Sequence, residues 1–526
     1  MEGHLFIIDG DLTKLSCDAW LLPTDGGFFV ESWCAELVGL AQEGILEAQP
    51  WAEGERFRPF TEEPPESNPW VWLGNVGRDE RWSADWFASQ AGEFVKQASH
   101  RIESLKVARP PKSGGLLPLL AVNALGSGKG GKASEKGALF EALIPRLRSS
   151  AEQCCVDVVL VTKGRAAYSA AQRVRRKLVN SDDAKWAIDE TWRLGPNAPN
   201  LQPIAEDIAQ SVQRDNLVLF FGAGVSIDAG IPPWQALLDE IARDAGLGGQ
   251  LDQLRNLDLR DQAAIVVRLL EKDGGSLSQL VATHTSATKY SLAHGLLASL
   301  AVREAVTTNY DNLFEAAVGN RDGGLAVLPG NAVKPSQRWL LKLHGSIEDE
   351  NNIVLTRDDY LGIATRRGAL IGLVQAMLMT RKMLFVGYSL TDEDFHSLIS
   401  DVRMAVPPGQ NLGVVITLLH NDFFEELWHR DIRVTPMMTS SSEPSDADNA
   451  VAARLVLVFL DLVGFLAADL DAFMLKPDYE SMLTDDEKLL AAALEQLSHS
   501  VSSLEDAPGL RRVHSLLSEF GLEGGE

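Results

Sequence analysis

The stretch NLVLFFGAGVSIDAGIPPW, residues 216–234, decides the fold of the central part of this chain. Its apolar first half predicts a buried strand over Leu217–Phe221. The strand leads directly into Gly222, Ala223 and Gly224. Glycine lets a backbone approach a phosphate closely, and the free N–H groups of a following helix can bind that phosphate. We therefore expect a nucleotide-binding turn here, with a tight turn that binds no ligand as the alternative.

More runs of strand length follow this turn and alternate with helical patterns. They are Ala305–Thr308, Trp339–Leu343, Met383–Val386 and Gly413–Thr417. This alternation predicts an α/β domain with a parallel sheet. Two stretches rich in Pro, Asn, Gly or Ser, Arg193–Pro203 and Met438–Asn449, have the composition of linkers. They delimit a central domain over residues 202–437.

The block before the first linker, residues 1–195, also predicts an α/β fold. Its apolar runs are Leu5–Ile8, Ala19–Pro23, Leu116–Asn123 and Val156–Thr162. A helical pattern over Lys136–Cys154 separates the last two runs, which indicates parallel strands joined by a helix. The last block, residues 450–526, is acidic and predicts a short helical region that packs through one apolar face.

The charge and cysteine content narrow the class of protein. The 48 Lys and Arg residues stand against 73 Asp and Glu residues, which gives a net charge of −25. This balance disfavours direct binding to nucleic acid or to an anionic membrane. The four cysteines lie at positions 17, 34, 154 and 155, and none are spaced as C-x-x-C. That usage suits a reducing cytoplasm and predicts neither a disulfide framework nor a zinc site.

Two apolar segments could be mistaken for targeting or membrane segments. The N-terminal MEGHLFIIDGD carries acidic residues and predicts a strand rather than a signal peptide. The most membrane-like stretch, Leu455–Leu475, is interrupted by Asp461, Asp469 and Asp471. A buried helix explains this pattern better than a membrane span. We therefore expect a cytoplasmic protein.

Four motifs follow one another between residues 216 and 389. The first is GAGVS followed, after three residues, by Gly230-Ile231-Pro232, which differs from the G-x-G-x-x-G of dehydrogenases. The others, each at the end of a predicted strand, are Thr308-Asn309-Tyr310-Asp311, Leu343-His344-Gly345 and Gly387-Tyr388-Ser389. In this order they resemble the motifs of the sirtuin family. The resemblance implies a Rossmann-like sirtuin domain that binds NAD and breaks its nicotinamide–ribose bond.

The resemblance also implies roles for individual residues. Asn309 and Asp311 would contact the nicotinamide ribose and position a water molecule. His344 would be the general base, since an unperturbed imidazole pKa near neutrality suits that task. Phosphate and adenosine contacts would come from Gly222, Ala223, Gly224, Ser226, Gly387 and Ser389, and the cofactor-binding motifs also include Gly230, Ile231, Pro232 and Thr308.

Each candidate also has a structural interpretation. His344 would then be a hydrogen-bonded histidine at the end of a strand, and Asn309 and Asp311 would be turn or helix-cap residues. Trp234 and Tyr388 fit packing better than catalysis. The sequence favours a structural role for His284 and His294, because both lie in a helical stretch.

The sequence departs from protein-deacylating sirtuins in three places. Their zinc module of paired C-x-x-C motifs has no counterpart, because no cysteine follows Cys155. Pro233-Trp234-Gln235 stands where the deacylases have Phe-Arg, and Thr308 stands where they have Gln. These features, together with IVLTRDDY at Ile353–Tyr360, resemble the SIR2-like branch of bacterial anti-phage defence.

That branch implies an NAD hydrolase that depletes the cell's NAD on a trigger, with NAD as substrate and no zinc or other metal. It also implies a homo-oligomer, and in some members a partner defence protein such as an ATPase or an Argonaute-like protein. Two alternatives stay open. One is an NAD-dependent deacylase or ADP-ribosyltransferase, and the other is a non-catalytic module that senses nucleotides.

The N-terminal block carries a second resemblance. Its segment IDGDLTKLSCDAWLLPTD, Ile8–Asp25, is similar to the start of a macro domain, in which Asp11 would contact adenine. The following strand ends in Pro23-Thr24-Asp25 instead of the N-A-N of that family. The glycine-rich stretch Leu125–Gly131 would cradle a phosphate or be a flexible loop. This macro-like α/β domain would bind a nucleotide or ADP-ribose, or have a structural or oligomerising role.

Overall fold

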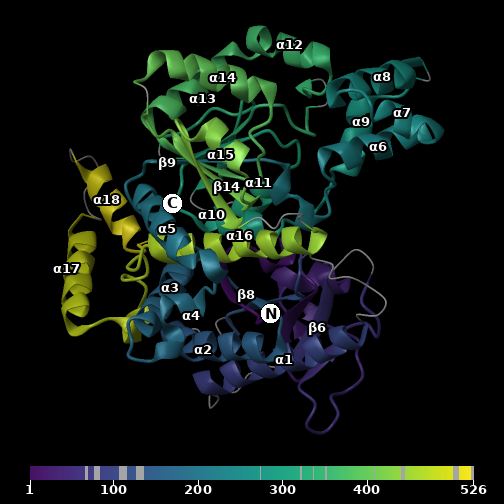
Figure 1. The fold of residues 1–526 in the computed structure, drawn as a ribbon. Helices are drawn as coiled ribbons and strands as arrows, with labels where there is room; N and C mark the ends of the chain where they lie inside the picture. The colour runs from purple at the N-terminus through teal and green to yellow at the C-terminus, as the bar shows by residue number, and fades with distance from the viewer. Residues whose placement is uncertain are drawn as a thin grey trace. The chain divides into compact units, whose positions relative to one another are not determined.

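The computed structural model describes residues 1–65, 69–75, 83–105, 115–125, 135–272, 274–319, 323–335, 337–349, 352–407, 409–439, 445–501 and 509–522. The chain divides into two compact units, one of Met1–Arg193 with Ala468–Glu526 and one of Leu194–Ala467 (Figure 1). The predicted domain limits of 1–195, 202–437 and 450–526 remain predictions. The predicted C-terminal helices divide between the units, because α16 (Asp446–Ala467) belongs to the second unit and α17 (Asp485–Val501) and α18 (Leu510–Glu519) belong to the first.

The second unit is built on a seven-stranded sheet in which all neighbouring strands are parallel. In spatial order the strands are β11 (Leu325–Leu328), β12 (Arg338–Lys342), β10 (Glu304–Thr307), β9 (Leu217–Phe221), β13 (Lys382–Val386), β14 (Gly413–Leu419) and β15 (Ile432–Met438). The predicted parallel sheet is confirmed, and β9 has the predicted bounds. The two strands that the sequence did not predict, β11 and β15, are the edge strands.

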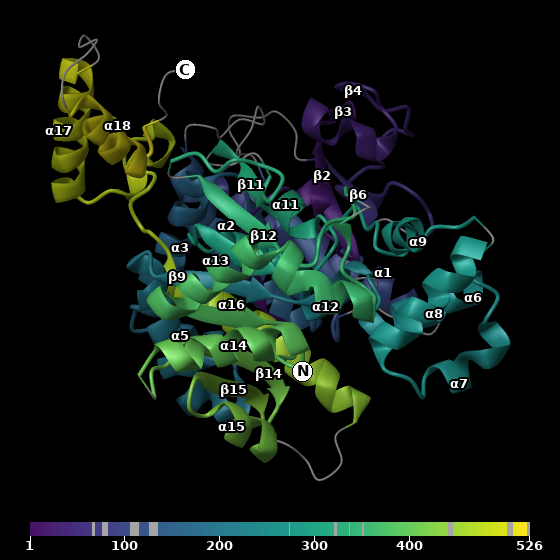
Figure 2. The ribbon, with the colours of Figure 1, turned by 90° about the horizontal axis from the view of Figure 1, so that it is seen from above.

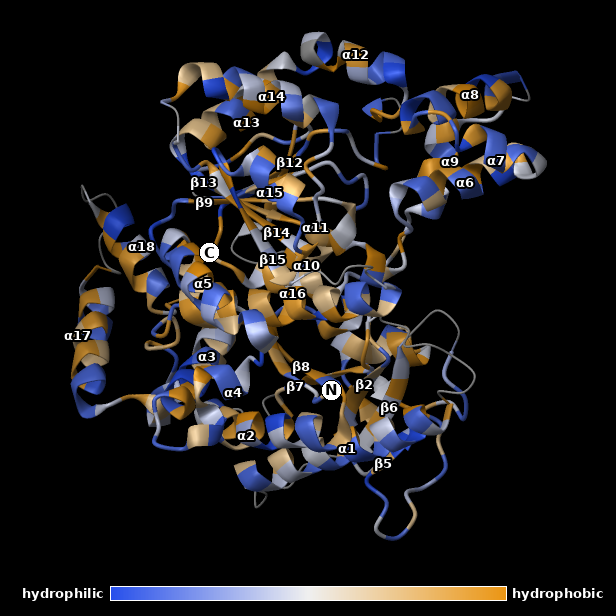
Figure 3. Cartoon of the chain, viewed as in Figure 1, coloured by the Kyte–Doolittle hydropathy of each residue, from blue (hydrophilic) through white to orange (hydrophobic). Residues whose placement is uncertain are grey.

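Strand β9 lies between β10 and β13, so the order of the strands along the chain reverses at β9. In open parallel sheets, ligands bind at such a switch point, beyond the carboxyl ends of the strands. All of β9 is buried, because helices cover both faces of the sheet (Figure 3). The motifs predicted at the ends of β9, β10, β12 and β13 therefore share one edge of the sheet.

Helices from distant parts of the chain cover the two faces of this sheet. On one face, α13 (Gly368–Thr380) and α14 (Glu393–Ala405) pack their apolar side chains against Phe220 and Phe385. On the other face lie α10 (Leu292–Ser299) and α11 (Leu313–Val318), where Phe314 contacts Phe221. Helix α5 (Ala198–Gln213) begins inside the stretch predicted as a linker, because Pro199 is compatible with the first turn of a helix.

A small helical module is inserted between β9 and β10. It consists of α6 (Trp234–Asp244), α7 (Leu251–Leu254), α8 (Leu259–Lys272) and α9 (Leu277–His284). These helices share their own apolar core, which includes Leu238, Ile241, Val266 and Val281. Figure 2 shows them as a lobe beside the sheet. The remaining helices of this unit are α12 (Arg357–Arg366) and α15 (Asp422–Trp428).

Helix α16 corresponds to the stretch predicted as a buried helix. It ends at Ala467, so the prediction that the helix reaches Leu475 is wrong. By length and composition alone, α16 is long and apolar enough to cross a membrane. Most of its apolar part is nevertheless buried inside the fold, including the side chain of Asp461. A helix in the core of a soluble protein can have the same length and composition.

The first unit contains a six-stranded sheet of its own. In spatial order its strands are β1 (Leu5–Asp9), β8 (Asp157–Thr162), β7 (Leu119–Asn123), β2 (Ala19–Thr24), β6 (Trp70–Asn75) and β5 (Phe57–Pro59). Only the β5–β6 pair is antiparallel. Besides α17 and α18, the unit contains β3 (Phe29–Val30), β4 (Gly44–Ile45), α1 (Ala84–Leu105), α2 (Lys136–Cys154), α3 (Arg165–Val179) and α4 (Ile188–Thr191).

The predicted strands and the helix over Lys136–Cys154 are confirmed as elements of this unit. The resemblance to a macro domain stays a prediction. The carboxylate of Asp11 accepts hydrogen bonds from the backbone and side chain of Thr13, at 2.9 and 2.6 Å, and caps a short helical turn. Residues 126–131 of the glycine-rich stretch lie outside the described residues.

Candidate active site at the carboxyl edge of the central sheet

The glycine turns that follow β9 and β13 contact each other directly. The backbone N–H of Gly222 donates to the carbonyl of Val386 at 3.1 Å, and that of Gly224 donates to the carbonyl of Gly387 at 2.9 Å. A Cβ atom on Gly224 would lie 2.7 Å from the Gly387 Cα, and one on Gly387 would lie 2.7 Å from the Val225 nitrogen. Gly387 also has a φ of +62°, which favours glycine. The two turns can therefore approach each other this closely only because Gly224 and Gly387 have no side chains.

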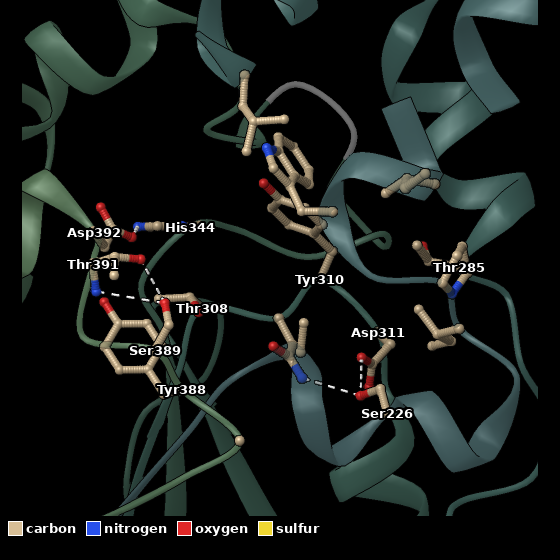
Figure 4. A pocket seen from close by; sticks show the side chains of 18 of the residues that line it. Ser226, Thr285, Thr308, Tyr310, Asp311, His344, Tyr388, Ser389, Thr391 and Asp392 are labelled. Atoms are coloured by element: carbon tan, nitrogen blue, oxygen red, sulfur yellow. Dashed lines mark hydrogen bonds and ion pairs between the residues drawn. The ribbon is translucent and has the colours of Figure 1, made fainter. Parts of the chain in front are cut away.

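A cavity of about 490 Å³ opens beside this junction. Its volume lies within the range usual for small-molecule sites. Of the residues singled out from the sequence, it is lined by Ala223, Ser226, Ile231, Pro232, Thr308, Asn309, Asp311, His344, Gly387 and Ser389 (Figure 4). Gly222, Gly224 and Gly230 shape the turns and do not line the cavity. The structure thus brings all four motifs to one cavity.

Asn309, Ser226 and Asp311 form a buried hydrogen-bonded chain at the cavity wall. The Asn309 Nδ2 donates to the Gly222 carbonyl at 3.2 Å and to the Ser226 Oγ at 3.1 Å. The Ser226 hydroxyl donates in turn to the Asp311 Oδ2 at 2.9 Å. Because its proton is used here, Ser226 links Asn309 to Asp311, and its predicted contact with a phosphate stays a prediction.

His294 lies behind this chain and is fully buried. Its Nδ1 lies 2.9 Å from the Ser291 Oγ, and its Nε2 lies 3.5 Å from the Ser226 Oγ. Burial lowers the pKa of His294 to about 4, although the Asp311 carboxylate acts in the opposite direction. His294 is thus neutral at pH 7 and orients Ser226, as the structural interpretation predicts.

The depressed pKa of His294 predicts an acid-sensitive fold. In the unfolded chain the ring has a pKa of about 6.5, so the free energy of unfolding is at its full value above that pH. It falls as the pH drops from about 6.5 toward 4, because only the unfolded chain binds the proton in that range. The full loss corresponds to about 3 kcal/mol, since one pKa unit equals about 1.4 kcal/mol. His294→Gln, which keeps a donor near Ser226, is expected to reduce this pH dependence. Urea unfolding of both chains between pH 4 and 7 measures it, and equal slopes would contradict the assignment.

His344 follows β12 and is 3% exposed. Its Nε2 lies 3.6 Å from the Asp392 Oδ2, and its ring packs edge-on against Tyr360 with the centroids 5.3 Å apart. Burial lowers the pKa of His344, and the Asp392 carboxylate partly opposes this effect. The ring is therefore unprotonated at neutral pH, which is the form that accepts a proton. Gly345 follows with a φ of +101° and turns the chain away.

The side chain of Lys342 is buried and contacts the loop that carries Asn309 and Asp311. Its Nζ donates to the Asp311 carbonyl at 2.7 Å and to the Asn312 Oδ1 at 2.6 Å, and it pairs with the Glu315 carboxylate at 2.6 Å. Burial raises the pKa of Glu315 above its ordinary value, and the nearby Lys342 ammonium group offsets only part of this rise. Lys342 was not predicted as a site residue, although a lysine that ends the apolar strand WLLK is a usable signal.

Two arginines connect helix α8 of the helical module to α14 and α12. Arg260, at the start of α8, donates to the Asp258 carboxylate at 2.9 Å and to Glu393, the first residue of α14, at 2.8 Å. Arg260 lowers the pKa of Asp258 to about 2. Arg357 binds Asp261 through two hydrogen bonds of 2.6 and 2.8 Å.

Several lining residues were not predicted from the sequence. They are Leu237, Asp258, Leu259, Arg260, Thr285, Tyr310, Tyr360, Thr391, Asp392 and Glu393. Trp234 and Tyr388, interpreted as packing residues, also line the cavity. Three of the lining residues that were not predicted, Thr391, Asp392 and Glu393, belong to the segment TDEDF, which follows the second glycine turn. Within the described ranges, no group of three or more His, Cys, Asp or Glu residues could hold a metal ion.

Comparison with known proteins identifies the central part of the chain. A family model described as SIR2-like domain matches residues 303–437. NAD(+) hydrolase ThsA of Bacillus cereus (strain MSX-D12) is 30% identical over 215 residues, which cover 39% of this chain and 44% of that protein. NAD(+) hydrolase ThsA of Enterococcus faecium is 29% identical over 212 residues, covering 38% and 43%. Defense-associated sirtuin 2 of Bacillus subtilis is 27% identical over 212 residues, covering 39% and 21%.

The central unit therefore carries a SIR2-like domain, as the four motifs predicted. The chain spans less than half of the length of these relatives. The family model begins after the first glycine turn, so residues 216–234 lie outside its match. The contact between that turn and Gly387, inside the match, joins the two parts in one site.

Proposed function

We propose that this chain, whose central unit carries a SIR2-like domain, hydrolyses NAD to nicotinamide and ADP-ribose. The observation that carries the proposal is the convergence of Asn309, Asp311 and His344 on one cavity at the switch point of the sheet. The names of the relatives, which include NAD(+) hydrolases and a defence-associated sirtuin, support the same activity. We extend the proposal to a regulated effector that depletes NAD during phage infection.

The reaction breaks the bond between the ribose C1′ and the nicotinamide nitrogen and forms a bond from C1′ to a water oxygen. Nicotinamide leaves as a neutral molecule, and the transition state carries positive charge on the ribose. A buried carboxylate at Asp311 stabilises such charge, because fixed charges act strongly in a site that excludes water. The unprotonated His344 accepts the proton of the attacking water or of a ribose hydroxyl. Asn309 fixes the Ser226–Asp311 pair.

The predicted binding residues would hold the rest of NAD at the glycine junction, the place where Gly222 and Gly224 contact Val386 and Gly387. Ala223 and Gly387 present backbone at the cavity wall, where a diphosphate can approach closely. Ser389 lines the cavity with its hydroxyl hydrogen-bonded to that of Thr391 at 2.6 Å, and it would face the adenosine half. Ile231, Pro232 and Thr308 line the cavity as well. The chemistry of this donor set, mainly backbone, hydroxyl and amide groups, fits a dinucleotide.

Water is the proposed acceptor rather than an acyl-lysine side chain. No cysteine follows Cys155, so the paired C-x-x-C module of deacylating sirtuins has no counterpart in the sequence. A deacylase or ADP-ribosyltransferase would consume acyl-lysine peptides or label a protein with NAD. A non-catalytic sensor would bind NAD without turnover under every trigger tested.

The setting of this activity is also part of the proposal. We expect a cytoplasmic homo-oligomer that works alone or beside a partner defence protein such as an ATPase or an Argonaute-like protein. The macro-like first unit would bind ADP-ribose or another nucleotide. An enzyme that depletes NAD must be silent until triggered, so its ligands must favour one of two states of the protein.

The test is nicotinamide release from NAD, measured by chromatography with purified full chain and with lysate of infected cells as the activator. We expect stoichiometric nicotinamide and ADP-ribose. Asn309→Ala is expected to lower the rate at least about 100-fold, because it releases the Ser226–Asp311 pair and so misplaces the carboxylate that stabilises the developing charge. Asn180→Ala, at an exposed helix end in the first unit, is the control. Full activity of Asn309→Ala would contradict the site, and acylated ADP-ribose as the product would contradict hydrolysis.

A further inference from the structure

We propose that a second cavity in the central unit binds an organic phosphate of about mononucleotide size. The cavity has a volume of about 620 Å³ and lies between the start of α5, the end of α15 and the edge strand β15. The Asn197 Nδ2 donates to the Pro436 carbonyl at 2.8 Å and closes the cavity on the side of α5. This cavity shares no lining residue with the one beside the glycine junction. The proposal is independent of NAD cleavage.

Two arginines without an ion-pair partner among the described residues give this cavity positive charge. Arg430 and Arg433 line it and are exposed, and neither forms an ion pair or a side-chain hydrogen bond with the described residues. The acidic groups of the lining are already engaged. Asp431 binds Arg403 at 2.6 Å, and Glu425 lies 3.5 Å from His420. A pair of free guanidinium groups in a chain of net charge −25 is a local site for an anion.

A buried hydroxyl at the same place lacks a hydrogen-bond partner. Thr435 is 1% exposed and lines the cavity, and its Oγ1 has no partner within the described part of the chain. Alternate residues of a strand project from the same face, so Arg433 and Thr435 share one face of β15. A polar group buried without a partner carries a free-energy cost. An oxygen of a ligand bound to Arg433 would complete the hydrogen bonding of Thr435.

The chemistry of the lining indicates the class of ligand. A guanidinium group binds phosphate through two parallel hydrogen bonds, and two such groups balance the charge of a phosphate monoester. Leu201 and Ile204 add apolar surface to the wall formed by α5. A free phosphate ion would leave most of the 620 Å³ unfilled. These features together favour a phosphate with an organic part, such as a nucleoside monophosphate.

Methyl NMR on the full chain with labelled isoleucine tests the proposal, with AMP and inorganic phosphate as probes. Ile204 and Ile432 line this cavity, whereas Ile231 lines the NAD cavity, so each methyl group reports where a probe binds. We expect saturable shifts at Ile204 and Ile432, with AMP binding more tightly than phosphate. The double variant R430A/R433A is expected to bind AMP at this cavity at least tenfold more weakly. R511A/R512A, which removes two exposed arginines of α18, is the matched control.

Thr435→Val separates a binding role from a structural one. Valine has nearly the same shape and lacks the hydroxyl, so it is expected to raise the unfolding temperature of the ligand-free chain and to weaken AMP binding severalfold. Shifts at Ile231 alone, or unchanged AMP affinity at Ile204 and Ile432 in R430A/R433A, would overturn the proposal. Equal affinities for AMP and phosphate would overturn the assignment of an organic ligand. None of these measurements depends on turnover of NAD.

Discussion

Replacing His344 by alanine is expected to lower the rate of nicotinamide release between about 100-fold and about 10 000-fold, the range over which a positioned general base contributes. The ring is buried at the cavity, and burial lowers its pKa, so the wild-type histidine is ready to accept a proton at pH 7. Alanine has no group that can take its place. The affinity for NAD is expected to change little, because the glycine junction and its contacts remain.

The control for this variant is another histidine of the same unit. His284 belongs to α9, where its ring nitrogens lie 3.2 Å from Glu240 and 2.8 Å from Asp244, and it does not line the cavity. His284→Ala is expected to keep the wild-type rate. Nicotinamide formation and NAD affinity are measured on all three chains. Unchanged turnover in His344→Ala would remove the histidine from the mechanism and leave the NAD-binding part of the proposal intact.

Replacing Gly387 by alanine is expected to destabilise the chain by about 2–5 kcal/mol and to abolish activity. A backbone with φ of +62° costs an L-residue roughly 1–2 kcal/mol. The new Cβ would lie 2.7 Å from the Val225 nitrogen, an overlap that costs roughly 1–3 kcal/mol more. Relief requires the two glycine turns to separate, which opens the site. Urea unfolding and nicotinamide release measure the two effects.

Gly372→Ala provides the matched control for this substitution. Gly372 lies within α13, and a Cβ there would meet nothing within 4 Å. Alanine has a higher helix propensity than glycine, so this variant is expected to be more stable than the wild type by up to about 1 kcal/mol. If both alanine variants unfold at the same urea concentration, close packing of the two turns does not limit the site.

The sequence was most informative where a short stretch determines its own structure. The strand β9 matched its prediction because LVLFF is buried on both faces, which makes the whole run apolar. The candidate site residues were visible because glycine, asparagine and histidine stand directly at strand ends. Their meeting at one cavity then followed from the parallel arrangement of the strands. Edge strands gave weaker signals, since β15 contains Arg433 and Pro436 and so departs from the usual composition of a strand.

Other features depend on contacts between distant residues and could not be predicted in this way. Arg260 meets Glu393 across 133 positions of the chain, a separation at which no local sequence pattern predicts a contact. The lysine at the end of WLLK is visible in the sequence, but its contacts with Asp311, Asn312 and Glu315 join separate segments of the chain. The division of the C-terminal helices between two units likewise depends on which apolar surfaces each helix meets. Local sequence patterns carry little information about such choices.

The insertion of α6–α9 between β9 and β10 has an evolutionary consequence. The module begins at Trp234 and ends at His284, and both Trp234 and Thr285 line the cavity at the carboxyl edge of the sheet. Helix α10 then returns the chain to the start of β10, which is parallel to β9. Changes in their length or composition can therefore accumulate without altering the order of the strands. Such changes would remodel the wall that carries Trp234 and Arg260 and leave Asn309 and His344 in place. Descendants of this fold could acquire a new substrate preference by varying this one insertion while they keep the same chemistry.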